Sequence, residues 1–290
     1  TVARRYRRLR SSGVLRVVGL KARKSAGGHG WFLRMRCVPG SGQAIAAALV
    51  RRTDTAWVQL LSGDTEVFCA LRGDAREDRA ALLSKLPRSD RIVAVTAYSL
   101  LHMFTGGPNG LAALKVLPEG QAEPLRYPVR GGHVELGELD EALFEALFEA
   151  LGEDGRAPYA DLAARTGWSE STVRRRVDQL RDAGVLYFDL EVDLPAFGFR
   201  STTWLSMSVP PARLAATGEA LAKFPEVAYA VATTGPSNLA VCVVCRDEAE
   251  FYDFLTAKAG ALPDVTHVET SPVIRTLKQA AATINRQARP

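Results

Sequence analysis

Two segments of this chain, 171 residues apart, have nearly the same sequence. Residues 1–15 read TVARRYRRLRSSGVL and residues 172–186 read TVRRRVDQLRDAGVL, with nine of the fifteen aligned positions identical. A shift of about 171 to 173 residues also aligns later positions, namely Trp31 with Trp204, Gly63 with Gly235 and Cys69 with Cys242. A solenoid repeat spans only ~20 to 50 residues, so this period is too long for one. The sequence therefore predicts two related multi-element halves in tandem, residues 1–104 and 172–277.

Composition places the chain among globular proteins. Its 290 residues are 47% hydrophobic and 24% charged, which is ordinary for a protein of about two domains with a full core. No apolar run approaches the roughly 18 to 20 residues of a membrane helix, and no apolar stretch with a cleavage site follows the basic start. We expect a cytoplasmic protein without a membrane partner.

Four cysteines are scattered along the chain, at Cys37, Cys69, Cys242 and Cys245. The last two form a C-x-x-C within the apolar run NLAVCVVC, which is typical of a strand, where residues three apart face opposite sides. We interpret the cysteines as buried apolar residues rather than as redox or metal groups. Because there is no second C-x-x-C and only four histidines, the sequence has no zinc pattern, and we expect no metal and no cofactor.

The net charge of +5 is concentrated at the start of the chain. Residues 1–24 carry nine Arg or Lys and no acid, so the remainder has 28 basic and 32 acidic residues, a balance of −4. A basic segment beside a predicted helix is typical of a nucleic-acid contact. A solvated basic terminus would have the same composition.

Residues 139–186 have the periodicity of three helices. Leucines recur every four residues from Leu139 to Leu151, which indicates an amphipathic first helix. After a turn at residues 153–156, a short second helix is expected over Tyr159–Arg165, and Gly167 can adopt the positive φ that closes it. Ser169 is a favourable N-cap for the third helix.

The third helix has one apolar face, formed by Val173, Val177 and Leu180. Its outward polar side chains are Ser171, Thr172, Arg174, Arg175 and Gln179. A tight turn containing glycine, followed by a helix that exposes hydroxyls and arginines, is typical of a helix-turn-helix whose second helix enters the major groove. The sequence therefore predicts contacts with double-stranded DNA by these residues and by Ser169. A helical bundle with a solvated arginine face is the alternative.

These residues resemble the helix-turn-helix of the Lrp/AsnC, or feast/famine, family of transcriptional regulators. The matching positions are Asp140, Asp154–Arg156, Leu162, Ala163, Gly167, Ser169, Val173, Arg176, Val177, Leu180 and Gly184–Leu186. The sequence departs from the family pattern at Gly137, where the first Asp of the opening motif would fall. The resemblance implies a winged helix-turn-helix that is followed by an effector-binding module.

The first copy contains only the end of this helical module. Val2, Tyr6 and Leu9 would form its inward face. The resemblance implies DNA contacts by its outward residues, Thr1, Arg4, Arg7 and Arg8. Because the chain has no starting Met and the two preceding helices are absent from it, we expect this first helix-turn-helix to be truncated.

After each repeated helix, strand and helix patterns alternate. In the second copy, strands are expected at residues 203–209, 227–234, 239–245 and 265–271, with helices at 211–223 and 247–259. The first copy repeats this order from Trp31 to Tyr98, with Leu82, Leu83 and Leu86 in its second helix. The order βαββαβ is that of the ferredoxin-like fold. We therefore predict an α+β chain, with winged helix-turn-helix and ferredoxin-like effector modules duplicated in tandem.

The predicted domain boundaries follow the repeat. Residues 1–24 are the remnant of the first helix-turn-helix, 25–104 the first αβ module, 105–136 a Gly- and Pro-rich linker, 137–193 the second helix-turn-helix, 194–278 the second αβ module and 279–290 a tail. The resemblance implies that two such modules pack sheet against sheet, because each sheet carries helices on only one face. We expect a pseudo-dimer within one chain, from which a larger homo-oligomer can form.

The hairpins of the two modules are the predicted effector sites. Their residues are Gly63, Asp64 and Glu66 in the first module and Gly235, Ser237 and Asn238 in the second. Small residues let a ligand approach backbone N–H groups that can hold a carboxylate, and Glu66 can pair with an α-ammonium group. Because Asn238 carries no charge, we expect the second site to be weaker or to choose a different ligand. A plain hairpin is the alternative.

Together these features predict a sequence-specific DNA-binding transcriptional regulator that a small metabolite modulates, and the resemblance implies an amino acid. No feature indicates catalysis, so we expect no enzyme. One alternative is an enzyme similar to the siroheme decarboxylases, for which His102 and Arg34 are the candidate tetrapyrrole-site residues. The other is an effector-binding protein without DNA contact.

Overall fold

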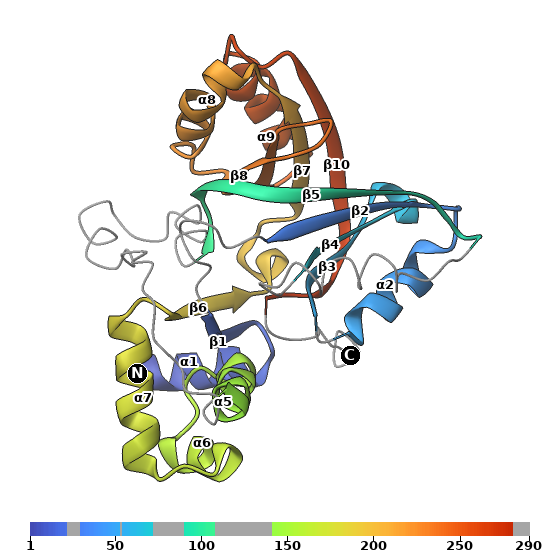
Figure 1. Cartoon of the computed structure of the whole chain (residues 1–290). Helices are drawn as coiled ribbons and strands as arrows, with labels where there is room; N and C mark the ends of the chain where they lie inside the picture. Colours follow the sequence, from blue (N-terminus) through green and yellow to red (C-terminus); the bar gives the residue numbers. More distant parts are fainter. Residues whose placement is uncertain (22–29, 53, 72–89, 108–140, 281–290) are drawn as a thin grey trace. The chain divides into compact units, whose positions relative to one another are not determined.

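The computed structural model describes residues 1–21, 30–52, 54–71, 90–107 and 141–280, and it divides into two compact units (Figure 1). The first unit combines residues 1–28 with residues 126–197. The second unit combines residues 29–125 with residues 198–279. Each unit therefore contains segments from both copies of the repeat.

The first unit contains the helical module of the second copy together with the helix and strand that open the chain. Its elements are α1 (Val2–Ser11), β1 (Leu15–Lys21), α5 (Glu141–Glu153), α6 (Tyr159–Thr166), α7 (Glu170–Asp182), β6 (Leu186–Val192) and the short η4 (Leu194–Phe197). Leu147, Leu162, Val173 and Leu180 form the centre of its core, so α5, α6 and α7 bury the apolar faces that their periodicity predicts.

Two local signals set the boundaries of α6 and α7. Gly167 ends α6 with a φ of 75°, a left-handed conformation that glycine adopts without steric cost. The Oγ of Ser169 then accepts a hydrogen bond from the backbone N–H of Thr172 at 3.2 Å. The predicted N-cap of the third helix is confirmed, and this cap directs α7 away from α6.

Helix α1 differs from its predicted packing. None of its side chains is fully buried, and Val2 is 86% exposed, although the pattern placed it on the inward face with Tyr6 and Leu9. Tyr6 and Leu9 are half-buried. The prediction was wrong for Val2, the first residue of α1, since its side chain is exposed to solvent.

The strands that follow the two repeated helices pair with each other. Strands β1 and β6 are antiparallel, with a register that runs from Leu15 opposite Val192 to Lys21 opposite Leu186. One face of this two-stranded sheet packs on α5, where Gly19 lies so close to Leu151 that an added Cβ would come within 2.8 Å of the leucine Cβ. The wings of the two copies therefore form one sheet within a single chain.

The second unit contains two modules, one from each copy of the repeat. The first has β2 (Trp31–Cys37), α2 (Gly42–Val50), β3 (Thr55–Leu61), η1 (Ser62–Asp64), β4 (Glu66–Leu71) and β5 (Ile92–Thr105). The second has β7 (Ser201–Ser208), η5 (Pro211–Arg213), α8 (Leu214–Leu221), β8 (Val227–Thr233), β9 (Leu239–Cys245), α9 (Glu248–Asp253), η6 (Phe254–Ala259) and β10 (His267–Lys278). The second module shows the complete ferredoxin-like order, which confirms the predicted fold class. The predicted second helix of the first module, with Leu82, Leu83 and Leu86, lies outside the described residues.

The last strand of each module is long and continues into the sheet of the other module (Figure 1). Strand β5 pairs first with β2, over residues 92–99, and then with β8, over residues 100–105. Strand β10 pairs first with β7, over residues 267–272, and then with β3, over residues 273–278. The eight strands close into a barrel in the order β10-β3-β4-β2-β5-β8-β9-β7. The sequence had ended the last strand at residue 271, because nothing local indicates the partner that extends it.

Three apolar cores hold the second unit together. One lies under α2 in the first module, and a second lies under α8 and α9 in the second module. A third core takes side chains from both modules, including Phe32, Phe68, Trp204 and Val231. The inner faces of the two sheets therefore pack on each other. All four cysteines are buried as predicted, and burial raises the pKa of Cys242 to about 12.

The register of the hairpins corrects two alignments of the repeat, Trp31 with Trp204 and Cys69 with Cys242, since Cys69 instead corresponds to Val241. Met35 pairs with Val67 in the first module, and Met207 pairs with Leu239 in the second, which corresponds to a shift of 172 residues. This shift aligns Phe32, not Trp31, with Trp204. Trp31 packs in the core under α2, whereas Trp204 packs between the modules. A difference of one residue on a strand moves a side chain to the opposite face.

Candidate nucleic-acid interface and ligand cavity

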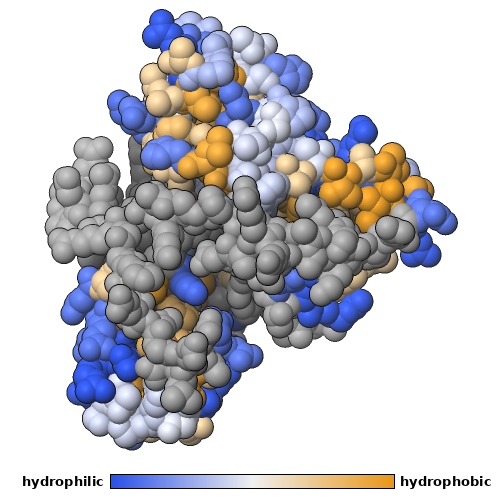
Figure 2. All heavy atoms as spheres, in the orientation of Figure 1, coloured by the Kyte–Doolittle hydropathy of each residue, from blue (hydrophilic) through white to orange (hydrophobic). Residues whose placement is uncertain are grey.

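The outer face of α7 exposes most of the residues that the sequence assigned to DNA contact. Ser169, Ser171, Arg174, Arg175 and Gln179 are exposed, and Thr172 is half-buried. The surface over α7, at the lower left of Figure 2, is mostly hydrophilic. This face is long enough to present two or three side chains to base edges, with others on flanking phosphates.

Three hydroxyls gather at the N-terminal end of α7. The Oγ of Ser169 lies 2.9 Å from the Oγ of Ser171 and 2.9 Å from the Oγ1 of Thr172. They stand beside the positive end of the helix dipole, which favours an anion. The cluster therefore offers hydrogen bonds to a phosphate next to the arginines.

The arginines of α7 have distinct surroundings. The guanidinium of Arg174 stacks over the Tyr159 ring, 4.9 Å from its centroid, so its stem is supported while its outer edge remains exposed. Arg176 points inward over the ring of Phe144 and donates to the Oε1 of Gln179 at 3.3 Å. A shallow depression along the exposed face is lined by Glu170, Ser171, Arg174, Arg175, Asp178, Gln179 and Asp182. Arginines and carboxylates together can read guanine and cytosine edges, respectively.

Helix α1 presents a second basic face. Thr1, Arg4, Arg7 and Arg8 are all exposed, as the sequence predicted. The Nε of Arg7 donates to the carbonyl of Ala3 at 3.4 Å, which keeps that side chain along the helix. The outward residues of both repeated helices are thus available at the surface of the first unit.

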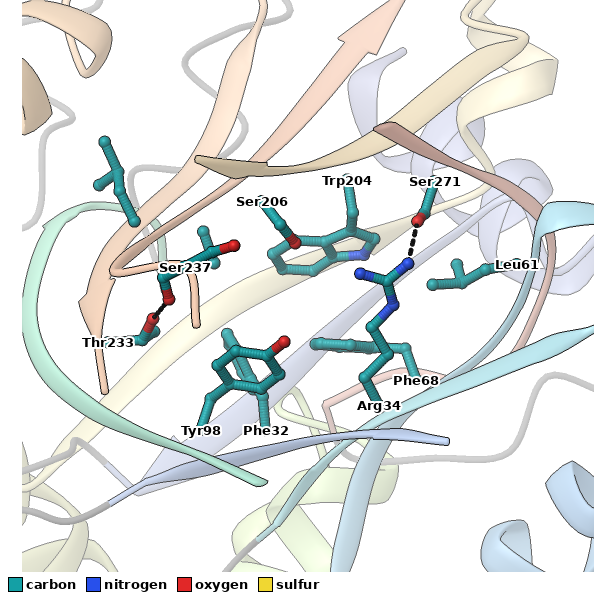
Figure 3. A pocket seen from close by; sticks show the side chains of 12 residues that line it. Phe32, Arg34, Leu61, Phe68, Tyr98, Trp204, Ser206, Thr233, Ser237 and Ser271 are labelled. Carbon is teal, nitrogen blue, oxygen red and sulfur yellow. Dashed lines mark hydrogen bonds between the residues drawn. The ribbon is translucent and has the colours of Figure 1, made fainter. Parts of the chain in front are cut away.

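A small cavity lies between the two modules of the second unit (Figure 3). Its volume is about 30 Å³, and its walls combine aromatic rings with a few polar groups. Phe32 and Phe68 lie 4.8 Å apart between ring centroids, and Trp204 lies 4.6 Å from Phe68. The indole N–H of Trp204 donates to the Oε1 of Gln59 at 2.8 Å.

Arg34 is the charged group of this cavity. It extends from β2 beside the Phe68 ring towards Ser271 on β10, whose Oγ accepts from its Nη2 at 3.0 Å (Figure 3). The same Nη2 donates to Glu66 at 2.8 Å and to Glu269 at 2.7 Å. Arg34 therefore joins two strands of the first module to the last strand of the second module.

The ionisation of this group follows from its geometry. Burial lowers the pKa of Arg34, but hydrogen bonds to Glu269 and Glu66 outweigh burial and raise that pKa. The hydrogen bond from Arg34 lowers the pKa of Glu269, and burial raises the pKa of the neighbouring Tyr98 hydroxyl. The guanidinium and the Glu269 carboxylate are therefore both charged at neutral pH.

The ion-pair network occupies one half of the pseudo-symmetric barrel. The shift of 172 residues places Ser206 at the position equivalent to Arg34, and Asn238 at the position equivalent to Glu66. The side chain of Asn238 bonds the backbone of Val209 twice, accepting from its N–H at 3.0 Å and donating to its carbonyl at 2.7 Å. The two halves have the same fold but different interior chemistry.

The six predicted effector residues are not gathered in one place. Ser237 lines the cavity. Glu66 pairs with Arg34 and also accepts a hydrogen bond from the hydroxyl of Ser271 at 3.2 Å. Gly235 lies against the Tyr98 ring. Gly63 and Asp64 lie instead at the turn beside Gly42, where α2 begins. The amide of Asn238, expected to meet an ammonium group, is committed to Val209.

Sequence reasoning missed the residues that dominate the cavity wall, which are Phe32, Phe68, Tyr98 and Trp204. A signal exists for Phe32 on β2 and Trp204 on β7, because residues two apart on a strand share a face, which places Phe32 beside Arg34 and Trp204 beside Ser206. The pairing of β5 and β10 across modules decides that those faces meet.

Arg34 and His102, the residues of the alternative enzyme, lie apart. Arg34 pairs opposite Thr96 on β5, and His102 follows six residues later on the same strand, ~20 Å away at about 3.3 Å per residue. His102 is exposed, with its ring 4.8 Å from that of Phe104. Among the described residues, no three or more His, Cys, Asp or Glu side chains are arranged to hold a metal ion. In that same part of the chain, no helix is long and apolar enough to cross a membrane.

Comparisons with known proteins match the two kinds of unit. The model of the AsnC-type helix-turn-helix domain matches residues 145–181, and the model of the Lrp/AsnC ligand binding domain matches residues 203–283. An uncharacterised HTH-type transcriptional regulator of Pyrococcus horikoshii is 32% identical over 139 residues, which cover 48% of this chain and 85% of that protein. The HTH-type transcriptional regulator FL11 of the same organism is 29% identical over 147 residues, covering 50% of this chain and 94% of that protein.

A solved structure resembles nearly the whole chain in fold. The siroheme decarboxylase NirDL superimposes with a TM-score of 0.56 at 12% sequence identity, covering 96% of this chain and 82% of that chain. At this identity the likeness concerns the fold alone.

Proposed function

The chain belongs to the Lrp/AsnC family of transcriptional regulators, and from that premise we propose that α7 reads double-stranded DNA and that an amino acid controls this binding. The observation that carries the DNA contact is the outer face of α7, where three hydroxyls lead into exposed Arg174 and Arg175. We assign base contacts to the arginines and Gln179, and phosphate contacts to the hydroxyls. The exposed arginines of α1 add contacts to the phosphate backbone.

The test of this proposal is selection of DNA by the intact chain. Fragments recovered from a random-sequence pool should share a motif, and the chain should bind this motif at least a hundredfold more tightly than scrambled DNA at the same salt concentration. Equal affinity for the motif and the scrambled sequence would contradict sequence-specific recognition.

The proposed effector site is the inter-module cavity with its flanking Glu66. A free amino acid carries a carboxylate and an ammonium group, so its carboxylate can take the place of Glu66 on Arg34, while Glu66 and Glu269 accept from the ammonium. The Phe68 and Trp204 rings would then face the side chain of the ligand. Because the cavity holds only about 30 Å³, binding requires the aromatic side chains to move apart. We therefore propose that effector binding changes the packing between the modules.

Calorimetry and thermal shift with the amino acids test this site. Glu66→Gln should weaken binding about tenfold or more, because it removes the carboxylate that receives the ammonium. Glu248→Gln is the matched control, since Glu248 is exposed at the start of α9. If an amino acid binds both variants with equal affinity, its site is not the cavity beside Glu66. If no amino acid binds the parent, the proposed effector class is contradicted.

We propose a regulator rather than an enzyme. Arg34 is committed to two carboxylates and His102 is exposed at a distance, so the two do not form one tetrapyrrole site. Absence of a Soret shift on titration with an iron porphyrin is the expected result, and saturable binding would favour the enzyme.

The remaining assignments follow from action on DNA. We propose a cytoplasmic protein with DNA-binding segments 1–24 and 137–193 and effector modules 25–104 and 194–278. The intramolecular pair of modules takes the place of a dimer, and further copies can add to it.

A further inference from the structure

The turn between α5 and α6 contacts the first copy of the repeat through three consecutive residues. A carboxylate oxygen of Asp154 accepts a hydrogen bond from the guanidinium of Arg10, in the last turn of α1. The backbone N–H of Gly155 donates to the carbonyl of Val17 on β1 at 2.9 Å. The guanidinium carbon of Arg156 lies 4.5 Å from the centroid of the Tyr6 ring. This turn, which we call the coupling turn, thus binds both elements of the first copy in this unit.

Gly155 fits because its backbone lies directly on β1. An added Cβ would come within 2.9 Å of the Val18 carbonyl carbon and 3.0 Å of the Gly19 nitrogen, distances that real Cβ atoms do not tolerate. These two neighbours are backbone atoms, which cannot rotate away, and Cδ1 of the Phe188 side chain is a third neighbour at 3.0 Å. A glycine at this position is therefore required by close approach to the first copy.

Asp154 and Arg156 both contact one face of α1. Tyr6 and Arg10 are four residues apart and share a face of the helix, while Arg4, Arg7 and Arg8 lie on another. The second carboxylate oxygen of Asp154 accepts a hydrogen bond from the backbone N–H of Arg156 at 3.0 Å. This hydrogen bond fixes the Asp154 side chain relative to Arg156. The side chain of Asp154 is half-buried, whereas Arg10 is exposed, so the pair lies at the edge of the contact between the turn and α1.

Helix α1 buries less of its own surface than α7 does. It has no fully buried side chain of its own, whereas α7, its repeat, buries Val173, Val177 and Leu180 against α5 and α6.

We propose that the coupling turn is the positioning element that holds α1 in a defined orientation relative to α7. The outward arginines of α1 then contribute to DNA binding only while the turn contacts Tyr6 and Arg10. This inference rests on the proposed DNA-binding function. It makes Asp154, Gly155 and Arg156 positioning residues that act on DNA through another helix. Two basic helices then meet DNA as one rigid surface.

The first experiment measures the orientation of α1 without DNA. Spin labels at Val2→Cys and Asp182→Cys report the distance between α1 and α7, and labelling is selective because all four native cysteines are buried. The parent should give one narrow distance distribution, and Asp154→Asn with Arg156→Gln should broaden it. Asn at position 154 can still accept from the Arg156 N–H, so the variant removes charge and stacking without removing that hydrogen bond.

The matched control is Asp161→Asn with Arg165→Gln, which makes the same two changes on α6. Its distance distribution should stay narrow. An unchanged distribution in the Asp154/Arg156 variant would overturn the proposal, as would equal broadening in the control. Helical circular dichroism of each variant checks that the unit remains folded.

The second experiment connects the turn to DNA. Arg4→Ala with Arg8→Ala should lower the slope of log affinity against log salt by about 2 in the parent and by much less in the Asp154/Arg156 variant. Equal losses in both backgrounds would overturn the proposal. A parent that bound no DNA would refute the proposed function instead, while the distance measurement would still decide whether the turn positions α1.

Discussion

At the scale of single residues, the interior of the barrel is defined by Arg34. Its guanidinium donates hydrogen bonds to Glu66, Glu269 and Ser271. The side chains of Arg34 and Glu66 are both largely buried. A buried pair is weak evidence for stability as a whole, but removing one partner leaves an uncompensated charge in a low-dielectric site. This asymmetry makes Arg34 more costly to remove than an exposed arginine on the same strand.

Replacement of Arg34 by Met should lower the free energy of unfolding by about 3 kcal/mol, because it leaves the Glu66 carboxylate buried without its cation. Urea denaturation measures this as a lower midpoint at constant slope. Arg36→Met, on the exposed side of β2, is the control and should have little effect. Adding Glu66→Gln to Arg34→Met should recover part of the loss, and a double variant as unstable as the sum of the single variants would contradict the pairing.

The arginines of α7 carry the residue-scale prediction for DNA. Arg174→Ala with Arg175→Ala should reduce operator affinity by roughly 1 to 3 kcal/mol for each lost base contact. Fluorescence anisotropy at fixed salt measures this loss. Arg213→Ala with Arg246→Ala removes the same charge from exposed positions of the second unit and should leave affinity nearly unchanged. Unaltered affinity and salt dependence in the α7 variant would exclude these arginines from the interface.

Asp189 should make the first unit sensitive to pH. Burial on β6 raises the pKa of Asp189 to about 7, with a further rise from Glu191 and an opposing hydrogen bond from the Leu190 N–H. Because the folded-state pKa lies above the unfolded one, the folded protein binds more protons between about pH 4 and 7. The contribution of Asp189 to stability is therefore fully present below about pH 4 and is lost as pH rises towards 7.

Asp189→Asn removes this titration and keeps an acceptor for Leu190. Thermal unfolding between pH 5 and pH 8 should show a smaller decrease of Tm with rising pH for the variant than for the parent. The variant should also be more stable than the parent at pH 8. Parallel curves for the two proteins would show that Asp189 titrates normally.

At the scale of elements, the ends of the long strands tie the modules together. The last residue of β10, Lys278, reaches into the first module, where its Nζ donates to the carbonyl of Arg52 at 2.6 Å and to that of Val50 at 3.3 Å. These carbonyls lie at the C-terminal end of α2, where a cation also complements the helix dipole. The strand of one module thus caps a helix of the other.

Lys278→Met should lower the free energy of unfolding by about 1 to 3 kcal/mol, because it keeps the apolar stem but removes the donor from two part-buried carbonyls. Chemical denaturation followed by tryptophan fluorescence measures the change. Lys223→Met, at an exposed position after α8, is the matched control. Equal stability of the two variants would mean that the Lys278 ammonium contributes nothing to the cap.

At the scale of the whole molecule, the chain forms internally the interface that two copies of a module would otherwise share. Pairing of β5 with β8 and of β10 with β3 supplies backbone hydrogen bonds at two seams. The core of Phe32, Phe68, Trp204 and Val231 lies between these seams. Separation of the modules would expose both the strand edges and this apolar core.

A cut between the modules should therefore leave them associated. With a protease site inserted into residues 108–136, outside the described residues, the cleaved halves should elute together from a sizing column at micromolar concentration. Association should resist high salt, because apolar burial and backbone pairing dominate the contact. Halves that separated under native conditions would contradict the shared core.

Much of this protein could be predicted from its sequence because the signals are local. Leucines spaced by four residues, together with Ser169 and Gly167, predicted the three helices and their ends. Alternation of apolar and polar residues predicted the ferredoxin-like strands, since helix and strand periods depend only on neighbouring residues. The tertiary structure alone decided that β5 and β10 cross between modules, that Arg34 meets Glu269 across 235 residues, and that the Asp154–Arg156 turn supports α1. Those contacts join residues far apart in the chain, where no periodicity relates one partner to the other. Their energy comes from desolvation and pairing that exist only once the modules have packed.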